Sequence, residues 1–342
     1  MRVTAILSRV LGLLLLAPLV MAAGPRPRFE LVPLGVSGGE LEGDSSSFLL
    51  RRPGDRTSAV MIDAGSPVSG IMRWKGVDSG RCSSKIRVDT VLATLDHTRA
   101  IVLTHAHLDH ILGLSLMSPL VLEKAFKGVT TPVYANRPTV DTIMSSLFTG
   151  QLWSDFTRIP SEKTPTYRLN VLAEGAPARI GAFVFEPVRL AHPVASSGFF
   201  ISTEDGATYL HLGDTGPTGA VWDRARPILA AGRLRAVSIE CSFPAHRATL
   251  AVKSGHLTPP LLVFELAKLA GLGALRQPDP ELFSMADARD LVPRLAPRLA
   301  GVRILVTHIK ILGRDKLVRE LEMLRRAGLS LEILEQAAPV LF

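Results

Sequence analysis

The sequence predicts an α/β protein. Apolar, β-rich runs alternate with segments of helical periodicity along the 342 residues, and this alternation is typical of α/β folds. No internal repeat and no low-complexity linker divides the chain, so we expect a single domain over residues 23–342. Aliphatic residues dominate and charged residues make up 20% of the chain, which excludes a disordered protein.

The expected strands are short apolar runs that are bounded by glycine, proline or charged residues. The strand candidates are Phe29–Leu34, Ser47–Arg51, Ala59–Asp63, Ala100–Thr104, Pro132–Ala135, Phe183–Leu190, Gly198–Thr203, Ala207–Leu212, Ala236–Glu240 and Arg303–Val306.

The expected helices show apolar residues at helical spacing. In residues 315–327, three leucines recur at this spacing with charged residues between them. The polar stretches 66–90 and 149–180 lack such a pattern and are expected to be loops. The helix candidates are Val88–His97, Thr139–Phe148, Thr258–Leu269, Met285–Leu295 and Asp315–Ala327.

The first residues are typical of an export signal. Arg2 and Arg9 form a basic region, the apolar run Val10–Val20 follows, and Ala22 ends a small-residue cleavage site. We therefore expect cleavage after Ala22, with residues 1–22 as signal peptide, and a periplasmic or secreted protein. An uncleaved anchor is the alternative, which the shortness of the apolar run disfavours. No other run has the length of a membrane span, which excludes a polytopic membrane protein.

The charge balance favours a small anionic substrate. The chain has 39 Lys and Arg against 31 Asp and Glu, and cleavage of the signal would leave 37 against 31. This excess is too weak to argue for nucleic acid as a partner. The two cysteines, Cys82 and Cys241, exclude a Cys-rich zinc module, and in an oxidising compartment they could pair. The oligomeric state stays open, a dimer included.

The strongest motif is Thr-His-Ala-His-Leu-Asp-His at residues 104–110. It places three histidines and one aspartate directly after an apolar run. Imidazole and carboxylate are good ligands for zinc-like ions, and burying so many polar groups without a cation would be costly. In an extended turn His105 and His107 would point the same way. Asp109 and His110 would open the next helix and face a second ion.

Further candidate ligands follow three other apolar runs. His192, Asp214 and His308 each stand just past a β-like segment, where side chains of neighbouring strands converge. With the first motif they provide five histidines and two aspartates. This donor set is enough for two divalent ions that share one carboxylate and one bridging hydroxide. Zn²⁺ is the expected ion, and Mn²⁺ or Fe²⁺ are the alternatives.

These residues, in this order and spacing, resemble the metallo-β-lactamase fold. The longer segment His105–Pro119 resembles the signature of class II cyclic-nucleotide phosphodiesterases, with one departure, since Ser115 stands where an aliphatic residue is usual. The segments Gly-His-Leu-Thr-Pro at 255–259 and Thr-His-Ile-Lys at 307–310 favour the same family. The resemblance implies a four-layer αββα sandwich, in which two β-sheets pack face to face with helices outside both.

The resemblance also implies how the ligands are divided between two metal ions. Each ion would take three residues of its own, and one aspartate would bridge both. The implied ligands are His105, His107 and His192 for the first ion, Asp109, His110 and His308 for the second, and Asp214 for both.

His256 remains free for proton chemistry. Its segment looks like the His-Ser-Thr element of tRNA-maturation nucleases of the same fold, in which a glutamate from a strand end pairs with the histidine. Glu240 is the matching glutamate here, so we expect His256, oriented by Glu240, to protonate a departing alkoxide. The alternative for His256 is phosphate binding or support of a metal ligand. Asp109 counts as catalytic with these two, and Asp63 is either an orienting residue near the metals or a turn former.

The implied activity is metal-dependent hydrolysis of 3′,5′-cyclic nucleotides, cAMP and also cGMP, to nucleoside 5′-monophosphates by a metal-bridging hydroxide. One alternative is another hydrolase of this fold, such as an RNase Z-like nuclease, a lactonase or a β-lactamase. Export argues against tRNA processing, and the pair Glu240 and His256 argues against β-lactam hydrolysis. The other alternative is a non-catalytic periplasmic metal-binding protein, which the complete ligand set and the additional His/Glu pair disfavour.

Overall fold

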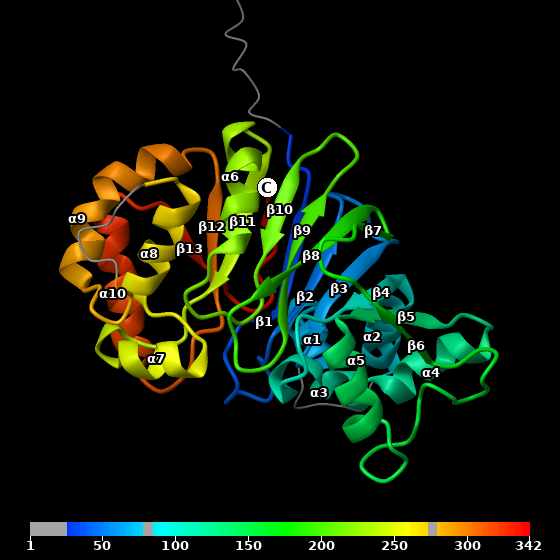
Figure 1. Cartoon of the computed structure of the whole chain (residues 1–342). Coiled ribbons are helices and arrows are strands. Elements are labelled where there is room, and N and C mark those ends of the chain that lie inside the picture. The colour runs from blue at the N-terminus through cyan, green and yellow to red at the C-terminus, as the bar shows by residue number, and fades with distance from the viewer. Residues whose placement is uncertain (1–25, 78–84, 273–278) are drawn as a thin grey trace, which may run out of the picture.

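Two seven-stranded sheets pack face to face at the centre of the molecule (Figure 1). The computed structural model describes residues 26–77, 85–272 and 279–342. The strand order is β14-β1-β2-β3-β4-β5-β6 in the first sheet and β13-β12-β11-β10-β9-β8-β7 in the second. Both sheets are mixed, because β3 to β6 and β10 to β13 run parallel within a sheet whose other neighbours are antiparallel. The expected pair of sheets with helices outside is confirmed.

Each half of the chain contributes most of one sheet. The strands of the first sheet are β1 (Glu30–Gly35), β2 (Ser47–Arg51), β3 (Ala59–Ala64), β4 (Thr98–Val102), β5 (Thr131–Ala135), β6 (Tyr167–Val171) and β14 (Val340–Leu341). The strands of the second are β7 (Ala178–Ile180), β8 (Phe183–Leu190), β9 (Ser196–Ser202), β10 (Thr208–His211), β11 (Leu234–Glu240), β12 (Arg303–Thr307) and β13 (Leu331–Ile333).

The helices fall into two groups, which appear on opposite sides of the sheets in Figure 1. The group on the first sheet comprises α1 (Pro67–Trp74), α2 (Lys85–His97), α3 (Leu108–Leu116), α4 (Ser118–Phe126), α5 (Arg137–Thr142) and the π-helical turn Ile143–Leu147. The group on the second comprises α6 (Ala220–Ala230), α7 (Ala248–Ser254), α8 (Pro259–Leu269), α9 (Met285–Leu295) and α10 (Arg314–Arg326), with short 3₁₀ turns at Ala245–Arg247 and Ala296–Leu299.

The central strands are apolar on both faces because both faces are covered. In β3, Val60 and Ile62 face the second sheet, whereas Met61 between them faces the helices. In β10, Tyr209 faces the first sheet and Leu210 faces the helices. This alternation follows from the period of a strand, and it explains why the sequence shows continuous apolar runs rather than an apolar–polar pattern.

Two stretches that were expected to be loops contain regular structure. Helix α1 lies within residues 66–90, and Gly70 lets it approach β1 closely, since a Cβ there would lie 2.0 Å from the carbonyl oxygen of Leu34. Within residues 149–180, β6 and β7 form sheet edges and are half exposed, so they lack the apolar run that identifies a central strand. The loop prediction for both stretches is wrong in these parts.

The C-terminal residue packs in the layer between the sheets. The ring of Phe342 is buried, with its centroid 5.4 Å from that of Phe29 and 5.0 Å from that of Tyr209. We expect Phe342→Ala to lower the free energy of unfolding by about 3 kcal/mol, because it leaves a cavity among aromatic rings. Urea unfolding checks this, with Leu341→Ala as the control, since that neighbour is 47% exposed. Equal stability of both variants would contradict this packing role.

Several expectations concern residues outside the described ranges. The signal peptide at residues 1–22 lies there, as does Cys82, so export and the pairing of the cysteines stay predictions. Cys241 is buried and forms no disulfide bond with any residue of the described ranges. Within the described ranges no helix combines the length and the apolar character of a membrane span. The single domain over residues 23–342 also stays a prediction.

Candidate metal centre

The polar residues of the centre lie at or just beyond the ends of strands from both sheets. Asp63 is the penultimate residue of β3, Glu240 ends β11 and His308 directly follows β12. Asp63 and His308 have positive φ values of 54° and 60°, a region that residues other than glycine adopt at a cost. The main chain therefore turns sharply where these side chains are needed.

Four side chains converge to form what we call the first cluster: His105, His107, His192 and Asp214. Their ligand atoms all lie within 4.8 Å of one another. His107 Nδ1 is 3.1 Å from His105 Nε2 and 3.2 Å from His192 Nε2. His105 Nε2 is 3.8 Å from Asp214 Oδ2. Three imidazole nitrogens and one carboxylate thus face a common point.

The second cluster consists of Asp109, His110, His308 and again Asp214. His308 Nε2 lies 3.2 Å from Asp109 Oδ2, 3.2 Å from Asp214 Oδ2 and 3.4 Å from His110 Nε2. Asp214 Oδ1 lies 3.4 Å from His110 Nε2. Asp214 therefore belongs to both clusters. The seven residues that the sequence singled out as ligands are brought together in the two groups that the resemblance implied.

The electrostatics of the two clusters fit cations. Burial lowers the pKa of His105, His107 and His192, which keeps these imidazoles neutral with lone pairs available for a metal. Burial opposes a charge on His110 as well. Three carboxylates around it nevertheless raise its pKa well above the usual value. Such an excess of buried negative charge is stable only beside a positive charge, so the donor set suits two divalent ions.

A second set of hydrogen bonds orients the imidazoles. His110 Nδ1 lies 2.8 Å from Asp63 Oδ2, and His192 Nδ1 lies 2.9 Å from the carbonyl oxygen of Gly255. His308 Nδ1 lies 3.0 Å from Ser242 Oγ. With a proton on each Nδ1, the Nε2 atom keeps its lone pair for a cation. Asp63 thus orients a candidate ligand and is not merely a turn former.

Asp63 also fixes the start of the ligand loop. Its Oδ1 accepts a hydrogen bond from the backbone N–H of Thr104 at 2.7 Å, and its carboxylate lies within 3.0 Å of Thr104 Oγ1. The sequence pattern did not identify Thr104 and Ser242 as supporting residues. Their position is the signal that could have done so, since Thr104 precedes His105 and Ser242 lies two residues after Glu240.

Glu240 and His256 form a buried pair beside both clusters. Glu240 Oε1 lies 2.7 Å from His256 Nδ1 and also accepts a hydrogen bond from the backbone N–H of Thr215 at 3.1 Å. Glu240 Oε2 accepts a hydrogen bond from the hydroxyl of Ser242 at 2.7 Å. Burial opposes a charge on His256, but Glu240 outweighs burial and raises the His256 pKa. His256 Nδ1 is 3.9 Å from Asp214 Oδ2, so the imidazole adjoins the shared carboxylate.

The remaining histidines lie apart from the two clusters. His97 ends α2 and His246 lies in a 3₁₀ turn, and both are exposed. His211 is buried, with Nδ1 at 2.9 Å from the hydroxyls of Tyr209 and Ser238. Burial lowers its pKa to about 4, so it is neutral at physiological pH.

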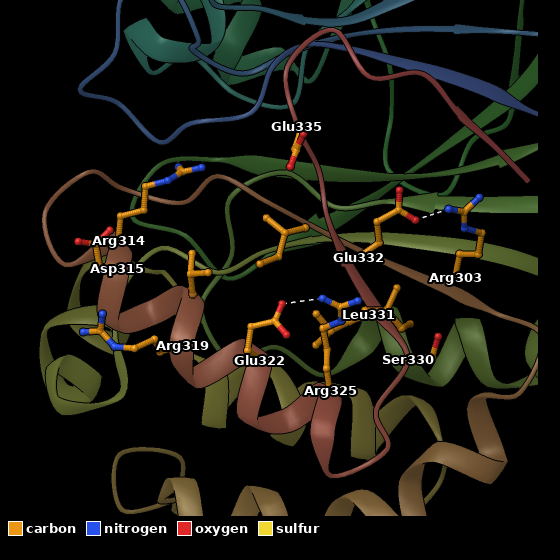
Figure 2. Close-up of a pocket in the computed structure, with 13 residues that line it drawn as sticks. Arg303, Arg314, Asp315, Arg319, Glu322, Arg325, Ser330, Leu331, Glu332 and Glu335 are labelled. Carbon is orange, nitrogen blue, oxygen red and sulfur yellow. Dashed lines mark hydrogen bonds and ion pairs between the residues drawn. The ribbon is translucent and has the colours of Figure 1, made fainter.

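A cavity of about 870 Å³ lies away from this centre, between α10, β12 and β13 (Figure 2). Its charged side chains largely neutralise one another. Arg303 pairs with Glu332, and Arg325 pairs with Glu322. None of the candidate metal ligands lines it, so it is separate from the metal centre.

Comparisons with known proteins agree with this geometry. The profile of the family "cAMP phosphodiesterases class-II" matches residues 81–327. A protein of Yersinia pestis described as a probable 3′,5′-cyclic-nucleotide phosphodiesterase is 27% identical over 301 residues, covering 82% of this chain and 78% of the relative.

Solved structures show the same fold. The crystal structure of unliganded yeast PDE1 has a TM-score of 0.71 at 18% identity, covering 92% of this chain and 99% of the other. The metallo-β-lactamase fold protein YhfI of Bacillus subtilis has a TM-score of 0.58 at 16% identity, covering 93% and 100%. The family resemblance and the fold that the sequence implied are confirmed. The chain belongs to the class-II cAMP phosphodiesterase family and has the metallo-β-lactamase fold.

Proposed function

We propose that this chain hydrolyses 3′,5′-cyclic nucleotides, cAMP and cGMP, to nucleoside 5′-monophosphates. Family membership gives the reaction class. The mechanism rests on one arrangement: the two His/Asp clusters share the carboxylate of Asp214. The pair of His256 and Glu240 lies beside that carboxylate. This combination offers both a place for an anionic phosphodiester and a proton for its leaving group.

The first cluster would hold one divalent ion and the second cluster the other. The nitrogen-rich donor set favours Zn²⁺, and Mn²⁺ and Fe²⁺ are the other candidates. Bound there, the two ions would supply an activated water molecule and neutralise charge on the phosphoryl oxygens. Asp214, which is almost fully buried, would hold both ions at a fixed separation.

The protein's own proton donor is His256. In hydrolysis a water molecule loses one proton as its oxygen bonds to phosphorus, the bond from phosphorus to the 3′-oxygen breaks, and the departing 3′-oxygen takes a proton. We assign that proton to His256, because Glu240 holds Nδ1 and leaves Nε2 as the donor. Glu240 is 1% exposed, so it stays within a low-dielectric environment in which its charge stabilises the imidazolium strongly.

Asp109 is the more solvent-accessible of the two carboxylates in the clusters. Its side chain is 16% exposed, against 3% for Asp214. Burial would raise its pKa, but His110 and His308 hold the pKa well below the usual range, so the group stays ionised. We propose that this carboxylate both holds the second ion and accepts a hydrogen bond from the attacking water.

Turnover of cAMP by the purified full-length protein tests the proposal. We expect 5′-AMP as the product, loss of turnover with a chelator, and recovery on addition of Zn²⁺ or Mn²⁺. Chromatography against 5′-AMP and 3′-AMP standards identifies the product, and elemental analysis counts the metal ions. A protein with two metal ions per chain that turns over neither cAMP nor cGMP would contradict the proposed substrate. Formation of 3′-AMP would contradict the assigned leaving group.

A further inference from the structure

Two loops from opposite sheets meet over the second cluster. The loop after β1 contains Ser37 and Gly38, and the loop after β12 contains His308 and Ile309. Ser37 and Ile309 form an isolated parallel bridge, and Gly38 N–H donates to the carbonyl oxygen of Ile309 at 3.3 Å. His308 N–H donates to the carbonyl oxygen of Val36 at 2.7 Å. These bonds hold the first loop directly over a candidate metal ligand.

Two glycines let this loop approach so closely. A Cβ on Gly38 would lie 2.8 Å from His308 Nδ1, so no side chain fits between the backbone and the imidazole. Gly39 has a φ of +69°, and its Cβ would lie 3.3 Å from Lys310 Nζ and 3.7 Å from Asp109 Oδ2. The missing side chain of Gly39 thus leaves a notch between a lysine ammonium and a ligand carboxylate of the second cluster.

The ammonium of Lys310 has no anionic partner among the described residues. It forms no ion pair with Asp109, and its one aromatic contact is the ring of Phe243, whose centroid lies 5.9 Å from Nζ. Lys310 is half-buried, so its charge is partly removed from water. A half-buried ammonium beside the second cluster that has no carboxylate partner among the described residues is suited to an anionic ligand.

We propose that Lys310 binds the phosphate of the cyclic nucleotide through the notch at Gly39. This inference rests on the proposed function, because the phosphate must be held at the second cluster for Lys310 to reach it. A 3′,5′-cyclic phosphate carries one negative charge on two non-bridging oxygens, and that charge grows as water adds to phosphorus. The compact ammonium of Lys310 donates a hydrogen bond to one of these oxygens. This hydrogen bond becomes stronger as negative charge develops on the oxygen.

Removal of the ammonium tests the proposal. We expect Lys310→Gln to lower kcat/KM for cAMP by about ten- to a hundredfold, which is the usual loss for a hydrogen bond to a charged group. Metal content should stay at the wild-type value. The same variant should weaken binding of inorganic phosphate and of 5′-AMP to the metal-loaded protein by a similar factor, as measured by calorimetry. Lys310→Arg should recover part of both losses, and Lys316→Gln, at an exposed lysine of α10, is the control.

The notch itself has a matched pair of variants. Gly39→Ala places a methyl group where the phosphate oxygen is proposed to lie. Gly54→Ala imposes similar backbone strain, at a φ of +79° and with nothing within 4 Å of its Cβ. We expect Gly39→Ala to raise KM for cAMP and to weaken phosphate binding. Gly54→Ala should change only stability.

The outcomes separate this inference from the proposed function. If the wild type hydrolyses cAMP but Lys310→Gln keeps its kcat/KM and its phosphate affinity, Lys310 does not bind the phosphate. If the wild type hydrolyses no cyclic nucleotide, the proposed function fails, and phosphate calorimetry still decides the role of Lys310. Equal affinity of the wild type and Lys310→Gln for phosphate overturns the inference in either case.

Discussion

Replacing Asp214 by alanine is expected to remove both metal ions and nearly all activity. Asp214 is the one residue common to the two clusters, and its two carboxylate oxygens face different histidines: Oδ1 lies nearest His110, and Oδ2 lies nearest His308 and His105. Its loss leaves each cluster with three ligands and removes the carboxylate between them. Metal ions contribute several kcal/mol of transition-state stabilisation, so kcat/KM should fall by about a thousandfold or more.

Elemental analysis after dialysis checks the metal content, and the rate of 5′-AMP formation checks the activity. Asp223→Ala is the control, because the Asp223 side chain is 71% exposed on α6 and forms an ion pair with Arg226 on the same helix. A variant of Asp214 that retains two ions per chain at wild-type affinity would show that this carboxylate does not hold both ions.

Replacing His256 by alanine should separate catalysis from metal binding. His256 belongs to neither of the two four-residue clusters, so both ions should remain. Loss of a general acid lowers turnover by about 10²- to 10⁴-fold, and we expect kcat for cAMP to fall within this range. Glu240→Gln should act in the same direction, because it removes the carboxylate that holds His256 Nδ1 at 2.7 Å.

A change of leaving group makes this test specific to proton donation. A 3′-alkoxide needs a proton to depart, whereas the nitrophenolate of bis(p-nitrophenyl) phosphate departs without one. The His256→Ala variant should therefore lose far more activity on cAMP than on the nitrophenyl diester. His246→Ala, at an exposed histidine, should match the wild type on both substrates. An equal loss on both substrates would assign His256 to binding or orientation instead of proton transfer.

Strong local signals predicted most of the central architecture. Strand β8 has the bounds that the apolar run gave, and α9 has the bounds that its periodicity gave, because each is long enough to carry its own pattern. Strands β13 and β14 were not predicted. They have three and two residues, and such short edge segments form only because a neighbouring strand supplies hydrogen-bond partners.

The candidate ligands could be identified from the sequence because their chemistry is unusual and their spacing is local. Four of the seven lie within residues 105–110, and the other three follow apolar runs. Imidazole and carboxylate groups at strand ends indicate a metal centre before any distance is known. The pattern alone left the role of Asp63 open, because an aspartate after a strand is equally common in a turn.

Residue types and local periodicity thus determined the fold class, the central strands and the set of candidate ligands. The tertiary structure decided which side chains meet. It brought Ser242 against His308, and Gly39 against both Lys310 and Asp109. The pair of Glu240 and His256 had already been expected from the family resemblance. The reason is physical: hydrophobic burial against neighbours explains each strand locally, whereas the contacts between distant loops depend on how the two sheets pack and on where a missing side chain leaves space.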